Sequence, residues 1–160
     1  EVGRTQEAGR LLDLEGLVRV TDVPGLPDAG LAELIEQHPS LLDSPANKST
    51  QGGGQTGELE PADYPPLDRL RAAIAGAVAA MSAELEASGR GAHPAMAWAS
   101  GSWALRLWGT VLRAGGCQSP HIHPLGWLSG VYYPRVPAAM TGSPQAGWRP
   151  RRCSCAGSGR

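Results

Sequence analysis

The sequence contains no phenylalanine, and its last acidic residue is Glu86, so everything after that position lacks Asp and Glu. Carboxylates are common general acids and bases and common ligands of hard metal ions. A catalytic or metal site built from residues after Glu86 must therefore use a carboxylate from earlier in the chain or contain none. All five tryptophans lie between Trp98 and Trp148.

No apolar run approaches the roughly 20 residues that a membrane-spanning helix needs, and there is no charged-then-apolar signal segment. The formal net charge of -1 gives no reason to expect nucleic acid or a membrane surface as a partner. Three cysteines (Cys117, Cys153 and Cys155) form an odd set unlike a disulfide framework. We therefore expect a reducing, cytoplasmic location. We expect no zinc at Cys153 and Cys155, which lack a second Cys or His pair.

Two helices are predicted from apolar spacing. Asp28 is a good N-cap for a short helix that ends at His38 and Pro39. The clearest helix follows Pro65 and Pro66 and stops at Gly89. Its apolar residues are spaced by three or four: Leu67, Leu70, Ile74, Val78, Met81 and Leu85. We expect this helix to pack across a sheet.

Strands are predicted over residues 17–23, where apolar and polar residues alternate, and as one long or two short strands over residues 97–112. Gly115 and Gly116 are expected to end the latter. Residues 45–61 are polar and rich in glycine, which favours a surface loop or a segment that folds over an active site. Two histidines, His38 beside Pro39 and His93 beside Pro94, are interpreted as helix-end and loop residues.

Residues 115–137, GGCQSPHIHPLGWLSGVYYPRVP, are the chemically most specific stretch. His121 and His123 are one residue apart, so on a strand both imidazoles point to the same face. Imidazole suits iron, zinc and copper. Pro124 and Gly126 are turn residues, and residues 128–133 are typical of a return strand. The pattern predicts a hairpin with a two-histidine patch at its mouth, although a pair of half-exposed strand histidines would give the same spacing.

Residues 121–137, HIHPLGWLSGVYYPRVP, resemble the core signature of the 2-oxoglutarate- and Fe(II)-dependent oxygenases that are often found downstream of tetratricopeptide repeats. Residues 49–56, STQGGGQT, are similar to the Gly-x-Gln-Thr segment of that family. The likeness covers roughly residues 17–137, and we see none from Ala138 onward.

This resemblance implies an α+β fold, namely a partial double-stranded β-helix of the jelly-roll or cupin type, backed by one or two N-terminal helices. It implies Fe(II) and 2-oxoglutarate as cofactors and hydroxylation of an unknown small-molecule or protein substrate. His121 falls on the first metal-ligand position, and His123 falls where most relatives carry an acid. Tyr132 matches a tyrosine that binds the co-substrate carboxylate.

We assign no catalytic residue. No histidine follows His123, so the family's distal metal ligand and its basic neighbour have no counterpart in this sequence. A group that hydrogen-bonds the other ring nitrogen normally fixes the tautomer of a metal-bound imidazole. Gln118, Ser119 and Ser129 are close enough in sequence to serve.

Three parts are expected along the chain. Residues 1–16 are the end of an upstream helical repeat or a frayed terminal helix, residues 17–137 are the N-terminal part of an oxygenase-like domain, and residues 138–160 are a disordered, unrelated tail. Because the chain begins with Glu1 rather than Met, we expect it to be a piece of a longer protein. We expect its oxygenase domain to be truncated after Pro137.

Three functions fit these observations. The first is a 2-oxoglutarate- and Fe(II)-dependent dioxygenase domain that lacks its distal ligand. The second is a non-catalytic fragment or pseudo-enzyme, in which missing strands would leave sheet edges exposed. The third is a cupin-like metal-binding module of other chemistry, because His-x-His also occurs in that architecture.

Overall fold

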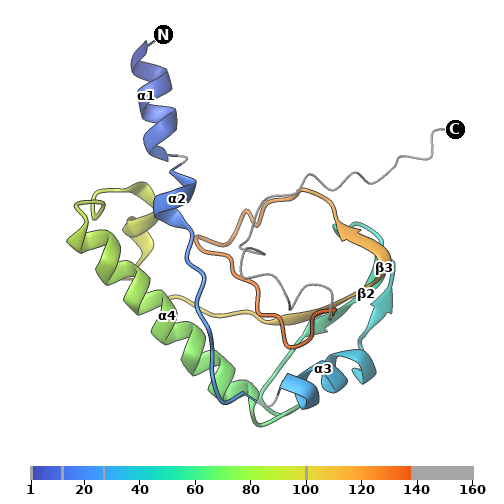
Figure 1. Ribbon diagram of the computed structural model, residues 1–160. Coiled ribbons are helices and arrows are strands. Elements are labelled where there is room, and N and C mark those ends of the chain that lie inside the picture. Colours follow the sequence, from blue (N-terminus) through green and yellow to red (C-terminus); the bar gives the residue numbers. More distant parts are fainter. Residues whose placement is uncertain (1, 12, 27, 100, 138–160) are drawn as a thin grey trace, which may run out of the picture.

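A computed structural model describes residues 2–11, 13–26, 28–99 and 101–137 (Figure 1). The elements in chain order are α1 (Val2–Leu11), α2 (Leu14–Leu17), α3 (Asp28–Gln37), β1 (Leu42–Asp43), β2 (Thr50–Glu58), α4 (Leu67–Ala87), the 3₁₀ helix η1 (Pro94–Trp98) and β3 (Trp108–Gln118). The three strands form one antiparallel sheet in the order β1-β2-β3. The fold is therefore α+β. A single three-stranded sheet is not the pair of facing sheets that defines a jelly roll, and that part of the expectation stays a prediction.

The longest pairing joins β2 to β3, two segments that are far apart in the sequence. Its register runs from Thr50 opposite Gln118 to Glu58 opposite Trp108, with two irregularities on the way. The expectation of a loop over residues 45–61 is thus wrong for its central part. A strand of polar residues and glycines does not show the apolar alternation from which strands are predicted.

Glycine makes this pairing possible because the two backbones approach very closely. A Cβ on Gly53 would collide with the carbonyl oxygen of Val111, and a Cβ on Gly116 would collide with the carbonyl oxygen of Gly52. Glycine in a strand often marks such a close approach of two backbones. Gly116 was expected to break the strand, but β3 continues through it to Gln118. That expectation is wrong because the residue serves contact between strands and not chain reversal.

Of the other predicted strands, those over residues 17–23 and 128–133 are absent from the described residues, and the one over residues 97–112 is present only in part. Residues 18–23 have no ladder partner, and Arg19 instead binds Glu84 of α4 with its Nε 2.6 Å from the carboxylate. Of residues 97–112, only the part from Trp108 onward is a strand. Residues 119–137 carry no strand, so the predicted hairpin is wrong. Pro120 and Pro124 have no N–H to donate to a ladder, which opposes strand pairing on both sides of the histidines.

Both predicted helices are confirmed as α3 and α4. The helix that packs on the sheet is α3, because Ile35 lies so close to Gly109 of β3 that no Cβ would fit there. The expectation that α4 crosses the sheet is not met, and Figure 1 shows α4 on the opposite side of the view from β2 and β3. The first turns of α4 contribute Leu67 and Leu70 to the main core cluster, which also contains Leu31 and Leu59.

Residues 2–11 form α1, which Figure 1 shows extending away from the sheet. The predicted disordered tail, residues 138–160, lies outside the described residues.

Cys117 is disulfide-bonded, contrary to the expectation drawn from the odd cysteine count. Among the described helices, none has both the length and the apolar character needed to cross a bilayer.

Leu67 is the most completely buried large side chain in the described core, with 1% of its surface exposed. We expect Leu67→Ala to lower the free energy of unfolding by about 2–5 kcal/mol, because it removes buried methyl groups and leaves a cavity. Leu125, which is 96% exposed, is the matched control, and Leu125→Ala should change stability by less than about 0.5 kcal/mol. Urea denaturation of both variants measures this, and equal effects would contradict the assigned core.

Candidate functional site

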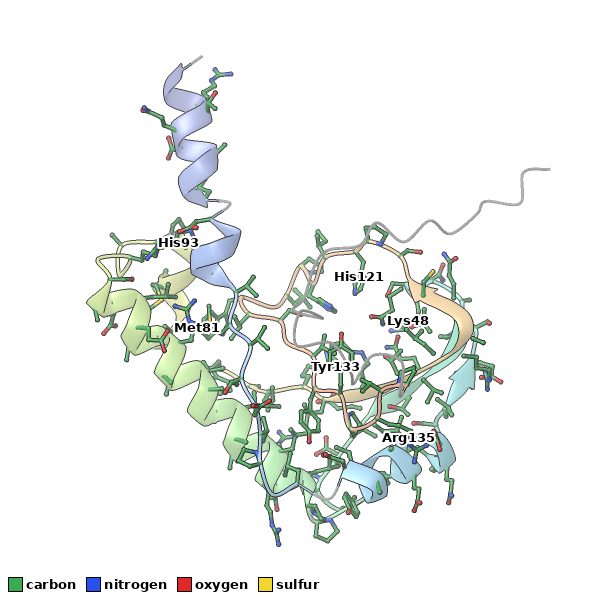
Figure 2. All side chains as sticks on the ribbon, in the orientation of Figure 1. Lys48, Met81, His93, His121, Tyr133 and Arg135 are labelled. Carbon is green, nitrogen blue, oxygen red and sulfur yellow. The ribbon has the colours of Figure 1, made fainter. Side chains whose placement is uncertain are left out.

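The two histidines follow directly on the end of β3. The backbone N–H of Ser119 donates to the carbonyl of Ser49 at 2.8 Å, which continues the contact with the β2 side by one residue. The N–H of Gly126 donates to the carbonyl of His123 at 2.9 Å, closing a tight turn at Pro124. The predicted turn is therefore present, although no return strand follows it. Figure 2 shows His121 on the segment that leaves β3.

The structure brings the two imidazoles side by side. The ring centroids of His121 and His123 are 4.9 Å apart, and the ring planes meet at 74°. His121 is exposed and His123 is half-buried. The two rings therefore lie close together on backbone that forms no strand, although strand geometry was the basis for expecting their proximity.

A single contact sets the tautomer of His121. Its Nδ1 lies 2.8 Å from the carbonyl oxygen of Ser119. Because a carbonyl can only accept, Nδ1 carries the proton and donates, and Nε2 keeps its lone pair. This is the arrangement that metal-binding histidines commonly show, with one ring nitrogen held by a backbone carbonyl and the other directed to the ion.

Among the described residues, the neighbour that holds the ring of His123 is aromatic and makes no hydrogen bond to it. The ring of Trp108, the first residue of β3, lies 5.6 Å from the ring of His123, measured between centroids, at an angle of 41°. Tilted aromatic pairs at this separation are favourable. The segment after β3 therefore folds back so that its second histidine rests on the residue with which the strand began.

The separation of the two rings suits binding of one cation, but the described residues supply only these two ligands. Two imidazoles that bind one ion through nitrogens about 2.1 Å from it place their ring centres roughly 5 Å apart, close to the separation found here. Among the described residues, no group of three or more His, Cys, Asp or Glu side chains could hold a metal ion. The described part of the chain thus offers two of the ligands that a non-haem iron site needs, and no third.

The segment that resembles Gly-x-Gln-Thr lies on β2, beside the histidine segment. Gln51 donates from Nε2 to the Oγ of Ser119 at 2.6 Å. Thr56 is buried, and its hydroxyl accepts the N–H of Gly109 at 2.8 Å. The two stretches that carried the family resemblance are thus neighbours in space. Gln51 was missed as a candidate because its strand was predicted to be a loop.

Only one of the three expected partner residues contacts an imidazole. Ser119 does so through its backbone carbonyl, whereas Gln118 extends its amide toward Thr50, with Nε2 3.5 Å from Oγ1. Ser129 is exposed. Trp108 was not predicted, because its contact arises from the folding back of residues 119–123 and has no local sequence pattern.

The other two histidines make local contacts. His38 follows α3, with Nδ1 2.7 Å from the Oγ of Ser40 and Nε2 3.5 Å from the carboxylate of Asp63. His93 precedes η1 and accepts the N–H of Ala95 at 3.1 Å. These positions agree with their interpretation as helix-end and loop residues.

The hydroxyl of Tyr132, which was expected to bind the co-substrate carboxylate, binds a carboxylate of the protein instead. Its hydroxyl donates to the Oδ1 of Asp28, the first residue of α3, and its ring packs against the core cluster. No contact among the described residues joins it to either histidine. Burial, and after it the hydrogen bond to Asp28, raises the pKa of Tyr132 to about 12.

This shift predicts a loss of stability in strong alkali. The folded chain holds the Tyr132 phenol neutral above its ordinary pKa of 10.0, so the stabilisation is complete below pH 10 and disappears as the pH rises to about 12. Asp28→Asn should lower the pKa of Tyr132 only in part, because burial is the larger cause. Absorbance titration of the phenolate, with Tyr132→Phe to identify its signal, measures both effects. If the pKa of Tyr132 fell to its ordinary value in the Asp28→Asn variant, burial could not be the larger cause of the shift.

A sequence model of the family described as Putative 2OG-Fe(II) oxygenase matches residues 106–155. The matched stretch contains β3, both histidines and Tyr132. It begins too late to test the likeness of residues 49–56, and it continues past Pro137, where the resemblance was expected to end. No curated protein and no solved structure matches the chain. Residues 106–155, less than half of the chain, therefore resemble a family whose description names Fe(II) and 2-oxoglutarate.

Proposed function

We propose that this chain carries part of a 2-oxoglutarate- and Fe(II)-dependent dioxygenase domain that hydroxylates its substrate, with His121 and His123 as two of the iron ligands. The observation that carries this proposal is the pair of imidazoles, 4.9 Å apart, inside the segment that matches the family. When bound, Fe(II) supplies, together with O₂ and 2-oxoglutarate, the oxidation of a C–H bond. The substrate is a small molecule or a protein, and we place the reaction in the cytoplasm.

The protein's own contribution is to hold two imidazole rings close to each other. The Nδ1–H of His121 is engaged by the Ser119 carbonyl, which leaves Nε2 as the donor atom. The ring of His123 rests on Trp108, which restricts its rotation. Holding ligands in place before the ion arrives reduces the loss of side-chain entropy on binding.

Tyr132 is the proposed contact for the 2-oxoglutarate carboxylate. Its hydroxyl donates to the carboxylate of Asp28 in the ligand-free chain. The same O–H can donate to a carboxylate of the co-substrate if it exchanges one acceptor for the other. A phenol whose pKa is raised to about 12 stays protonated at neutral pH and remains a donor for this exchange.

The fold proposed for the complete domain is a double-stranded β-helix, of which β1, β2 and β3 are a part. β3 supports this, because it leads directly into the histidine segment. The exposed apolar side chains of that segment also support it: Ile122, Leu125, Leu128, Val131 and Tyr133. Side chains of this kind belong in contact with further strands.

A second candidate is favoured by one specific observation. The described residues provide two metal-binding side chains and no third, and no Asp or Glu follows Glu86. A non-catalytic fragment, or a cupin-like module that binds a metal for another purpose, would also be consistent with a two-histidine pair. The experiment below separates these functions from the oxygenase.

Adding Fe(II) and 2-oxoglutarate to the full chain without oxygen should give a visible charge-transfer absorption band. His121→Ala and His123→Ala should each weaken metal affinity by more than about 100-fold, beyond the roughly 10- to 100-fold cost of losing an outer partner. His93→Asn is the matched control, because it keeps a residue suited to precede η1. Metal binding without any effect of 2-oxoglutarate would favour the cupin-like module. If both alanine variants bound the metal as tightly as the unaltered chain does, the proposed site would be wrong.

Trp108 should report metal binding directly. Ni(II) at the histidine pair should quench tryptophan fluorescence, and Trp108→Phe should remove the largest share of this quenching because its ring adjoins His123. Trp103→Phe is the control, since Trp103 lies beside α4 residues Ala75 and Ala79. Comparable quenching in the Trp108→Phe variant and the unaltered chain would mean that the metal binds elsewhere.

A further inference from the structure

Ser119 is the residue through which β2 reaches His121. Three different groups of Ser119 are engaged. Its N–H donates to the carbonyl of Ser49 at 2.8 Å, its Oγ accepts from the side-chain amide of Gln51 at 2.6 Å, and its carbonyl accepts from Nδ1 of His121 at 2.8 Å. Two of these contacts come from the β2 side, and the third leads to the imidazole.

The direction of the Ser119 carbonyl is therefore not set by its own segment alone. Ser119 lies one residue beyond the end of β3, so its position depends on the bonds it makes to Ser49 and Gln51. The bonds from Ser49 and Gln51 hold the residue on both its backbone and its side-chain groups. With Ser119 held in this way, its carbonyl points at the imidazole two residues later.

We propose that Gln51 is a positioning residue for His121, acting through Ser119. The side-chain amide of Gln51 fixes Ser119, and the Ser119 carbonyl in turn keeps His121 as the Nδ1–H tautomer with Nε2 directed to a cation. This role rests on the function proposed above, which makes His121 a metal ligand. It gives a chemical reason for a glutamine on a glycine-rich strand, at a position where its side chain adds nothing to the core.

The place of Gln51 in the strand supports this role. Gln51 pairs with Cys117, and the register shifts immediately afterwards, between Gln51 and Gly53. Gly52 has a backbone φ of 63°, a conformation that glycine adopts without cost. A register irregularity at this point can change the direction of the neighbouring side chains. Gln51 is itself exposed, so its replacement should leave packing intact.

The test compares four variants of the full chain: Gln51→Ala, Ser119→Ala, the double variant, and Gln55→Ala as the control. Gln55 is the matched residue on the same strand, and its amide oxygen accepts from Thr50 instead, at 3.4 Å. The first measurement is the tautomer of His121 in the metal-free chain, from long-range ¹⁵N correlations of the imidazole. The second is the affinity for Ni(II).

Gln51→Ala should lower the Nδ1–H population of His121 and weaken Ni(II) binding roughly 10-fold, as loss of an outer partner does. The double variant should be no weaker than either single variant, because both remove the same hydrogen bond. Gln55→Ala should leave both readings unchanged.

Unchanged tautomer populations in Gln51→Ala, or additive losses in the double variant, would overturn the positioning role. The tautomer reading does not depend on bound metal. If Ni(II) affinity is the same in His121→Ala as in the unaltered chain, the proposed function fails. The tautomer result then decides separately whether Gln51 orients the imidazole.

Discussion

The pairing of β2 with β3 is the interaction on which the rest of this structure depends. It joins residues 50–58 to residues 108–118, with a long helix between them in the sequence. The strands meet through glycines, since a side chain at Gly53 or Gly116 would strike the opposite backbone. This close approach carries Gln51 to within hydrogen-bonding distance of Ser119. Without it, Ser119 would lose its contacts with Ser49 and Gln51.

The core secures the other end of the same segment. Leu31 of α3 and Leu67 of α4 pack in one cluster, and Tyr132 lies against that cluster while its hydroxyl reaches Asp28. The stretch after β3 is therefore held at Ser119 by β2 and at Tyr132 by α3, although it forms no strand of its own. This explains how two histidines on irregular backbone come to have defined neighbours, Trp108 for one ring and a carbonyl for the other.

Sequence patterns predicted the helices well and the strands poorly, for different physical reasons. The stripe from Leu67 to Leu85 repeats every three or four residues, a local signal that α4 confirms. The alternation over residues 17–23 is equally local, but a strand also needs a partner, and no strand of the described residues pairs with it. The glycine-rich residues that became β2 showed no alternation, because their pairing depends on small size and not on an apolar face.

The sequence by itself predicted that the rings of His121 and His123 would lie close together, and their centroids are 4.9 Å apart, although the strand on which that prediction rested is absent from the described residues. Its resemblance to the oxygenase family is confirmed by the match over residues 106–155. Only the tertiary structure decided which nitrogen of His121 is left for a ligand and which ring supports His123. Those contacts come from Ser119, held by β2, and from Trp108, at the far end of β3. A choice made by partners that are distant along the chain leaves no periodic pattern in the sequence.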